Sequence, residues 1–128
     1  MERILLCKPK MSGHEIDFIK AALDGDWAVP LGPDCDAFEH ELEVFVGQGK
    51  RVAALVSGTA ALHLALIACG VKPGDEVMVQ SFTFCASANP VAYLGATPVF
   101  IDSERDTWNM GPDLLEHAIV DRLRLTGK

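Results

Sequence analysis

The sequence predicts an α/β fold in three layers, with a mainly parallel sheet flanked by helices. Short apolar stretches alternate with helical patterns in the second half of the chain, and strand–helix units in series form parallel sheets with right-handed crossovers. The first apolar stretch, residues 52–56, shows no polar–apolar alternation, as expected of a strand covered on both faces. Of the 128 residues, 49% are hydrophobic, which suffices for the core of one domain.

The composition argues against two classes of partner. The formal net charge is −7 at pH 7, so the chain lacks the basic surface that binds nucleic acid or anionic membranes. No apolar run has the length of a membrane span, and the first residues do not have the pattern of a signal peptide. The four cysteines include no Cys-x-x-Cys pair and have no histidine at metal-ligand spacing. We therefore expect reduced thiols, no metal site and a cytoplasmic location.

Two helices are predicted before the first strand. Residues 12–15, SGHE, have the spacing of a capping box, and the apolar residues that follow predict a helix from about residue 13 to 23. Residues 26–34, DWAVPLGPD, hold two prolines and a glycine and are predicted to be a loop. A second helix is expected through residues 38–46, ending at Gly47. Its acidic residues are expected to form a solvated face: Glu39, Glu41 and Glu43.

Three strand–helix units follow these helices. The predicted strands are residues 52–56, 76–80 and 97–102, and the predicted helices are residues 60–69, 85–94 and 112–120. Pro90 lies inside the second of these helices, so we expect it near a first turn or at a kink. The pair Gly111-Pro112 marks the start of the last helix.

Small and polar residues follow each predicted strand. Ligands of open parallel sheets bind beyond the carboxyl ends of the strands, so residues 81–84, residues 102–104 and the Ser57-Gly58-Thr59 turn are expected at one rim. Gly58 allows an anion to approach the backbone closely. Thr59 offers an amide and a hydroxyl, and the following helix brings its positive end. The turn therefore predicts a phosphate site; the alternative is that Ser57 or Thr59 only caps the helix.

Aromatic and acidic residues extend the predicted rim. Phe82 and Phe84 flank Thr83, where one ring could stack on a planar cofactor while the other packs; the alternative is two ordinary core residues. Asp102 and Glu104 could act as an acid–base pair, although a solvated turn is the better interpretation. The histidines fall on predicted helices away from the rim and are interpreted as structural or solvated: His14, His40, His63 and His117.

The stretches GPDCDAFEHELEVFVG and VSGTAALHLALIACGVKPGDEVMVQSFTFCASANPVAYLGATPVFID resemble the amino-terminal part of the DegT/DnrJ family of sugar aminotransferases. These are pyridoxal-phosphate enzymes of the aspartate-aminotransferase fold, fold type I. The resemblance covers nearly the whole chain from Gly32 onward and rests on several linked motifs in the same order. It implies that residues 1–128 form the amino-terminal part of the large domain of such an enzyme.

The resemblance also assigns roles to individual residues. It implies that Gly58 and Thr59, with Ser57 beside them, bind the phosphate of pyridoxal 5′-phosphate, and that Phe84 stacks on the pyridine ring. Asn89 lies in the same family motif with no more than a possible site role. The loop from Trp27 to Gly32 resembles the family's segment near the substrate, so Trp27 is a candidate substrate-binding lid residue. A tryptophan that simply docks on the core is the alternative.

The function implied by the resemblance is amino transfer to a keto-sugar nucleotide in cell-surface polysaccharide biosynthesis, with a donor such as glutamate and a homo-oligomeric enzyme. In the family, a later part of the chain supplies the Schiff-base lysine and an aspartate that pairs with the pyridine nitrogen. No lysine here matches that motif, so we expect a truncated chain without a catalytic residue of its own. The alternatives are a sugar dehydratase of the same family and a catalytically silent fragment that acts through self-association or protein binding.

The resembled fold also raises a question about the sheet. In that fold the strand before Ser57 lies at one end of the sheet, the next two strands lie together at the other end, and later strands fill the gap. We therefore expect this chain to rearrange its strands, to borrow a strand from a partner, or to leave unpaired edges that favour association.

Overall fold

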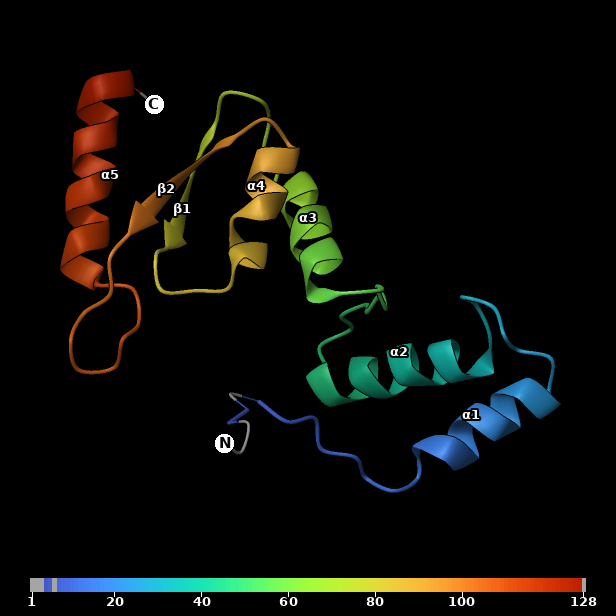
Figure 1. Cartoon of the computed structure of the whole chain (residues 1–128). Helices are drawn as coiled ribbons and strands as arrows, with labels where there is room; N and C mark the ends of the chain where they lie inside the picture. Colours follow the sequence, from blue (N-terminus) through green and yellow to red (C-terminus); the bar gives the residue numbers. More distant parts are fainter. Residues whose placement is uncertain (1–3, 6, 128) are drawn as a thin grey trace. The chain divides into compact units, whose positions relative to one another are not determined.

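The computed structural model describes residues 4, 5 and 7–127. The chain divides into two compact units, Met1–Ala54 and Leu55–Lys128, and each is described by itself. The helices and strands are drawn in Figure 1. No helix among the described residues is both long and apolar enough to cross a membrane.

The first unit begins with helix α1, Glu15–Asp24, which starts two residues later than the sequence predicts. Only half of the predicted capping box forms. The Glu15 carboxylate accepts hydrogen bonds from the backbone amides of Ser12 and, at 2.9 Å, Gly13. The Ser12 hydroxyl accepts at 3.2 Å from the amide of His14 rather than from Glu15. These bonds, first of all the one from the Ser12 backbone, lower the pKa of Glu15 to about 2.

The predicted loop after α1 is present, and helix α2, Pro33–Val46, follows it. Proline is favoured in the first turn because that turn has no partner for the missing amide, so α2 begins earlier than residue 38, where its apolar face begins. The loop seats the ring of Trp27 on two glycines. A β-carbon on Gly32 would come within 2.9 Å of Trp27 Cε3, and one on Gly25 within 3.1 Å of Cδ1.

The strand predicted at residues 52–56 is absent, because these residues form neither helix nor strand. The backbone amides of Val52 and Ala54 donate instead to the side chains of Glu43, at 3.1 Å, and Glu39, at 2.7 Å. A strand needs the backbone groups of a neighbouring strand, and none lies alongside this segment in the described chain. The prediction of a third strand is therefore wrong for this chain.

The same bonds correct the prediction for the acidic face of α2. Glu39 and Glu43 are half-buried and hydrogen-bonded, whereas Glu41 between them is exposed as predicted. The pattern along α2 separates apolar from acidic positions, but it contains no signal for a tertiary contact with residues 52–54.

The second unit contains the predicted α/β arrangement. Its elements are α3 (Gly58–Ala68), β1 (Glu76–Gln80), the 3₁₀ helix η1 (Cys85–Ser87), α4 (Asn89–Tyr93), β2 (Thr97–Ile101) and α5 (Pro112–Thr126). The helix predicted at residues 85–94 divides into η1 and α4, with Pro90 in the first turn of α4 as predicted. The last helix extends to Thr126 rather than ending near Val120.

The two strands pair in parallel and separate two helical layers. Glu76 lies opposite Thr97, and the register continues to Gln80 opposite Ile101. Figure 1 shows α5 on one side of this sheet and α3 with α4 on the other. The core cluster is formed by Val79, Val91 and Ala96, with Leu66 of α3 packed against it. The α/β fold with a parallel sheet and flanking helices is therefore confirmed, with a smaller sheet than expected.

A candidate phosphate and cofactor site at the carboxyl ends of the strands

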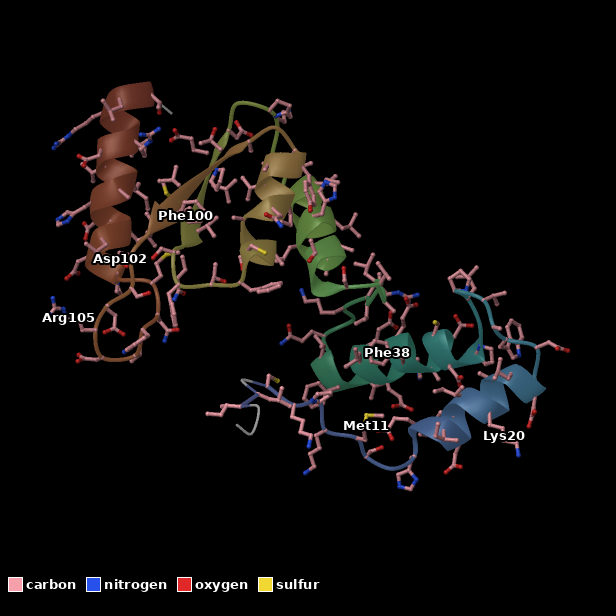
Figure 2. All side chains as sticks on the ribbon, in the orientation of Figure 1. Met11, Lys20, Phe38, Phe100, Asp102 and Arg105 are labelled. Atoms are coloured by element: carbon pink, nitrogen blue, oxygen red, sulfur yellow. The ribbon has the colours of Figure 1, made fainter. Side chains whose placement is uncertain are left out.

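The two strands of the second unit end at the same rim. In Figure 1, β1 and β2 both end on the side where α3, α4 and α5 begin. The amide of Ser81 donates to the carbonyl of Ile101 at 2.8 Å, and its hydroxyl donates to Asp102 Oδ1 at 3.2 Å. Figure 2 labels Asp102 at this point, directly after β2. Two of the three segments of the predicted rim, those that follow β1 and β2, are thus joined by hydrogen bonds just beyond the strand ends.

The start of α3 leaves two backbone amides free at this rim. Ser57 is the N-cap, and its hydroxyl accepts a hydrogen bond from the amide of Ala60 at 3.2 Å. The first backbone bond of the helix runs from the amide of Ala61 to the carbonyl of Ser57 at 3.0 Å. Within the described part of the chain, no protein acceptor is found for the amides of Gly58 and Thr59. Ser57 therefore caps the helix, and the amides of the next two residues remain as candidate donors to an anion.

The surroundings of these amides suit an anion. A β-carbon on Gly58 would meet nothing within 4 Å, so the backbone is accessible there. The first turn of α3 contains no acidic side chain, so the positive end of the helix dipole is not neutralised by a neighbouring carboxylate. Thr59 is half-buried and adds a hydroxyl beside the two amides. The donor set, two amides and one hydroxyl, fits the oxygen atoms of a phosphate group.

The two phenylalanines after β1 have different surroundings. The ring of Phe82 contacts Trp108 edge to face, with ring centroids 5.3 Å apart and an interplanar angle of 65°. Phe84 is 78% exposed, and it immediately precedes η1, which is in contact with α3. Neither phenylalanine is a core residue of the described structure. Both residues are largely exposed, Phe82 at 62%, and they differ in that Phe82 has an aromatic partner in the described chain.

The acidic residues after β2 are used in the loop itself. Glu104 accepts from the amides of Asp106, at 2.6 Å, and Thr107, at 2.7 Å, and also from the Thr107 hydroxyl. These bonds, with the hydroxyl first, lower the pKa of Glu104. Asp102 accepts from Ser81 and from the amide of Ser103. Both carboxylates act as turn acceptors, which favours the turn interpretation over an acid–base pair.

Sequence reasoning missed one residue of this rim. The side-chain amide of Gln80 donates to the carbonyl of Trp108 at 2.7 Å and holds the loop that carries the Phe82 contact. Trp108 itself has a φ of 65°, an uncommon conformation for a bulky residue. A glutamine at the end of a strand carries no signal of such a contact, because its partner lies 28 residues later in the chain.

The remaining candidates lie in other surroundings. The ring of His63 packs edge to face on Tyr93, with centroids 5.7 Å apart, and His14 lies near Asp17. All four cysteines are free thiols. No cluster of three or more metal-ligating side chains occurs in the part of the chain that the structure describes. Asn89 is the exposed first residue of α4.

A cavity of about 570 Å³ lies away from the rim, at the amino end of β1. Its lining includes Glu76 and Met78 of β1 together with Ile119 and Arg122 of α5. The phosphate site expected from the sequence does not coincide with this cavity. That site consists of exposed backbone donors on the side of the opposite ends of the strands.

Comparison with known proteins relates this chain to one family of aminotransferases. The DegT/DnrJ/EryC1/StrS aminotransferase family matches residues 9–125. "Putative pyridoxal phosphate-dependent aminotransferase EpsN" from Bacillus subtilis (strain 168) is 52% identical over 123 residues, which cover 96% of this chain and 31% of that protein. GDP-perosamine synthase from Caulobacter vibrioides is 40% identical over 124 residues, covering 97% of this chain and 33% of that protein.

Solved structures show the same likeness in three dimensions. "Putative sugar aminotransferase Spr1654 from Streptococcus pneumoniae, PLP-form" superposes with a TM-score of 0.79 and 37% sequence identity, covering 91% of this chain and 29% of that one. The chain therefore spans about a third of the length of these relatives.

Proposed function

Because this chain belongs to the DegT/DnrJ/EryC1/StrS aminotransferase family, we propose that it provides the phosphate-binding turn and the ring-stacking residue of a pyridoxal 5′-phosphate site. The observation that carries the proposal is the pair of free amides at Gly58 and Thr59. They begin an eleven-residue helix, follow a capping serine and have no acidic neighbour in their turn. The family, whose α/β architecture is fold type I, is one of aminotransferases that use this cofactor.

The residues of this chain bind and orient the cofactor in this proposal. The amides of Gly58 and Thr59 and the Thr59 hydroxyl donate to the phosphate, which the positive end of α3 also attracts. The Ser57 hydroxyl already accepts from Ala60, so Ser57 positions the turn. The exposed ring of Phe84 covers one face of the pyridine ring. When bound, pyridoxal phosphate supplies the carbonyl and the electron-withdrawing ring that amino transfer requires.

We propose no proton-transfer role for any residue of this chain. The described lysines are all exposed: Lys8, Lys10, Lys20, Lys50 and Lys72. The rim carboxylates of Asp102 and Glu104 are occupied by hydrogen bonds within their own loop. We therefore expect no turnover when the purified chain is mixed with cofactor, an amino donor and a keto-sugar nucleotide. Multiple turnovers would contradict this division of roles.

The proposed substrate is a keto-sugar nucleotide, with an amino donor such as glutamate. One relative is named a sugar aminotransferase and another a synthase of a GDP-linked product, which supports this substrate class. Trp27 stays a candidate for substrate contact, because the residue is 48% exposed although its ring lies against two glycines. We place the protein in the cytoplasm, where nucleotide sugars are made and used.

We also propose that the enzyme is a homo-oligomer. Helix α3 is apolar around most of its circumference, yet Leu62, Leu64 and Ile67 are each more than two-fifths exposed. A helix that is apolar on all sides is normally covered by protein. Multi-angle light scattering of the chain should therefore show association, and a monomer at all concentrations would contradict it.

The cofactor site is tested best with pyridoxamine 5′-phosphate, because this form has no aldehyde to react with exposed lysines. Calorimetric titration of the chain should show tighter binding of pyridoxamine 5′-phosphate than of pyridoxamine, which lacks the phosphate. Thr59→Val should lower the affinity for pyridoxamine 5′-phosphate by about tenfold, since a hydrogen bond to a charged group is lost. The affinity for pyridoxamine should stay the same.

Thr83→Val is the matched control for this titration. Thr83 is also a rim threonine, but its hydroxyl is paired with Ser87 at 2.8 Å. The control should bind both ligands as the unmodified chain does. Equal affinity of the unmodified chain for the two ligands, or an equal loss in both variants, would reject the phosphate site.

A further inference from the structure

Two glutamates of α2 take the place of a neighbouring strand beside residues 51–54. Glu39 accepts from the amide of Ala54 at 2.7 Å, and Glu43 accepts from the amide of Val52 at 3.1 Å. All four residues belong to the first unit. The bonded amides alternate along the chain, and the bonded glutamates are four residues apart on the helix.

The spacing of the two elements explains how both bonds form together. Residues four apart on a helix are separated by about 6 Å along its axis. Alternate residues of an extended chain are separated by about 6.7 Å and direct their amides to the same edge. One face of α2 can therefore satisfy two successive donors of one edge, as the carbonyls of a paired strand would.

The burial and charge of these side chains set them apart from their neighbour. Glu39 and Glu43 are half-buried, and the Glu43 side chain, only 17% exposed, also pairs with Arg51 Nε at 3.2 Å. Glu41 is exposed and has no hydrogen bond in the described structure. Charged acceptors form stronger hydrogen bonds with amides than neutral acceptors do. The contact is therefore specific to positions 39 and 43 rather than a general property of an acidic helix.

We propose that Glu39 and Glu43 form an edge guard for the segment 51–54. Their carboxylates occupy the donors of one edge and prevent that edge from pairing with the same segment of a second copy of the chain. Residues 52–56 are all apolar, with a valine at each end, and an unprotected edge of an apolar extended segment is a template for association. The segment then has only its opposite edge available for β-pairing. This role is independent of the cofactor site.

Amide hydrogen exchange measured by NMR on the whole chain tests the two bonds separately. Glu39→Ala should raise the exchange rate of the Ala54 amide by roughly tenfold, since a bond to a charged acceptor is lost, with a smaller change at Val52. Glu43→Ala should show the reverse pattern. Glu41→Ala removes the same charge from the same helix and should change neither amide. Unchanged exchange at Ala54 in Glu39→Ala and at Val52 in Glu43→Ala would overturn the proposal.

Association tests the guarding role itself. The double variant Glu39→Ala/Glu43→Ala should form assemblies that scatter light and bind thioflavin T, whereas Glu41→Ala/Glu116→Ala, with the same net charge, should behave as the unmodified chain. Equal association of the two double variants would overturn the guarding role. If circular dichroism shows that the first double variant has lost helix, Glu39→Ala and Glu43→Ala are each compared with Glu41→Ala in the same assay. Equal association of the three single variants would also overturn the guarding role.

Discussion

The guanidinium of Arg122 in α5 holds the carboxylate of Glu76 at the start of β1 through two hydrogen bonds, from Nε to Oε2 at 2.8 Å and from Nη2 to Oε1. The bonds, followed by the charge of Arg122, lower the pKa of Glu76, against the opposing effect of burial. In turn, the hydrogen bonds to Glu76, followed by the charge of Glu76, raise the pKa of Arg122. This pair ties the outer helix to the sheet at the end opposite the candidate cofactor site.

The first prediction concerns the pH dependence of this pair. Because the pKa of Glu76 is lower in the folded chain, its contribution to stability is complete above the ordinary glutamate pKa of about 4.3. The contribution is lost as the pH falls through the lowered pKa. Arg122→Met should therefore reduce the free energy of unfolding at pH 7 and leave a smaller difference from the unmodified chain near pH 3.

Urea denaturation at the two pH values measures this difference, with Arg124→Met as the control. Arg124 is also on α5, but it is exposed and only approaches Asp121 at 4.0 Å, so its replacement should have little effect. A loss in Arg122→Met that is the same at both pH values would show that packing, rather than the ion pair, is responsible.

The second prediction concerns the N-cap of α3. Ser57→Ala removes the acceptor of the Ala60 amide and should lower the free energy of unfolding of the second unit by about 1 kcal/mol. Ser57→Asn should retain most of the stability, because asparagine is also a favoured cap. Urea denaturation followed by circular dichroism compares the three proteins. Equal stability of the alanine and asparagine variants would mean that the cap contributes nothing measurable.

The features predicted correctly from the sequence depend on local patterns. The bounds of β1 and the place of Pro90 in a first turn follow from residues within one turn or one strand, and so does the cap at Ser57, which the sequence offered as an alternative to the phosphate site. The same kind of pattern predicts a strand at residues 52–56, but a strand also needs a partner, and a local pattern cannot show whether one is present. The contact of Glu39 with Ala54 spans 15 residues, so no periodicity along α2 could indicate it.

The third prediction separates the two phenylalanines after β1 and rests on the proposed cofactor site. Phe84→Ala should weaken the binding of pyridoxamine 5′-phosphate by about 0.5–1.5 kcal/mol, the range of an aromatic pair. The stability of the chain should stay the same. Phe82→Ala should have the opposite profile, because it removes the contact with Trp108 and leaves the Phe84 ring in place. Calorimetric titration and urea denaturation of both variants give the comparison. A larger loss of affinity in Phe82→Ala would reverse the assignment of the stacking ring.

The last prediction concerns the seat of Trp27 in the loop before α2. Gly32 has a φ of 149°, and a β-carbon there would come within 2.9 Å of the indole ring. Gly32→Ala should therefore displace the ring and also strain the backbone, at a cost of about 1–3 kcal/mol for the strain alone. Gly13→Ala is the control, because Gly13 has a φ of 98° but open space around it, so this variant has the strain without the clash.

In a Trp108→Phe background, Trp27 is the remaining tryptophan of the sequence, and its fluorescence reports directly on the surroundings of its ring. The emission should shift to longer wavelength and become more accessible to acrylamide in Gly32→Ala, and should be unchanged in Gly13→Ala. The same emission and quenching in all three proteins would show that the indole is not seated on Gly32 in solution.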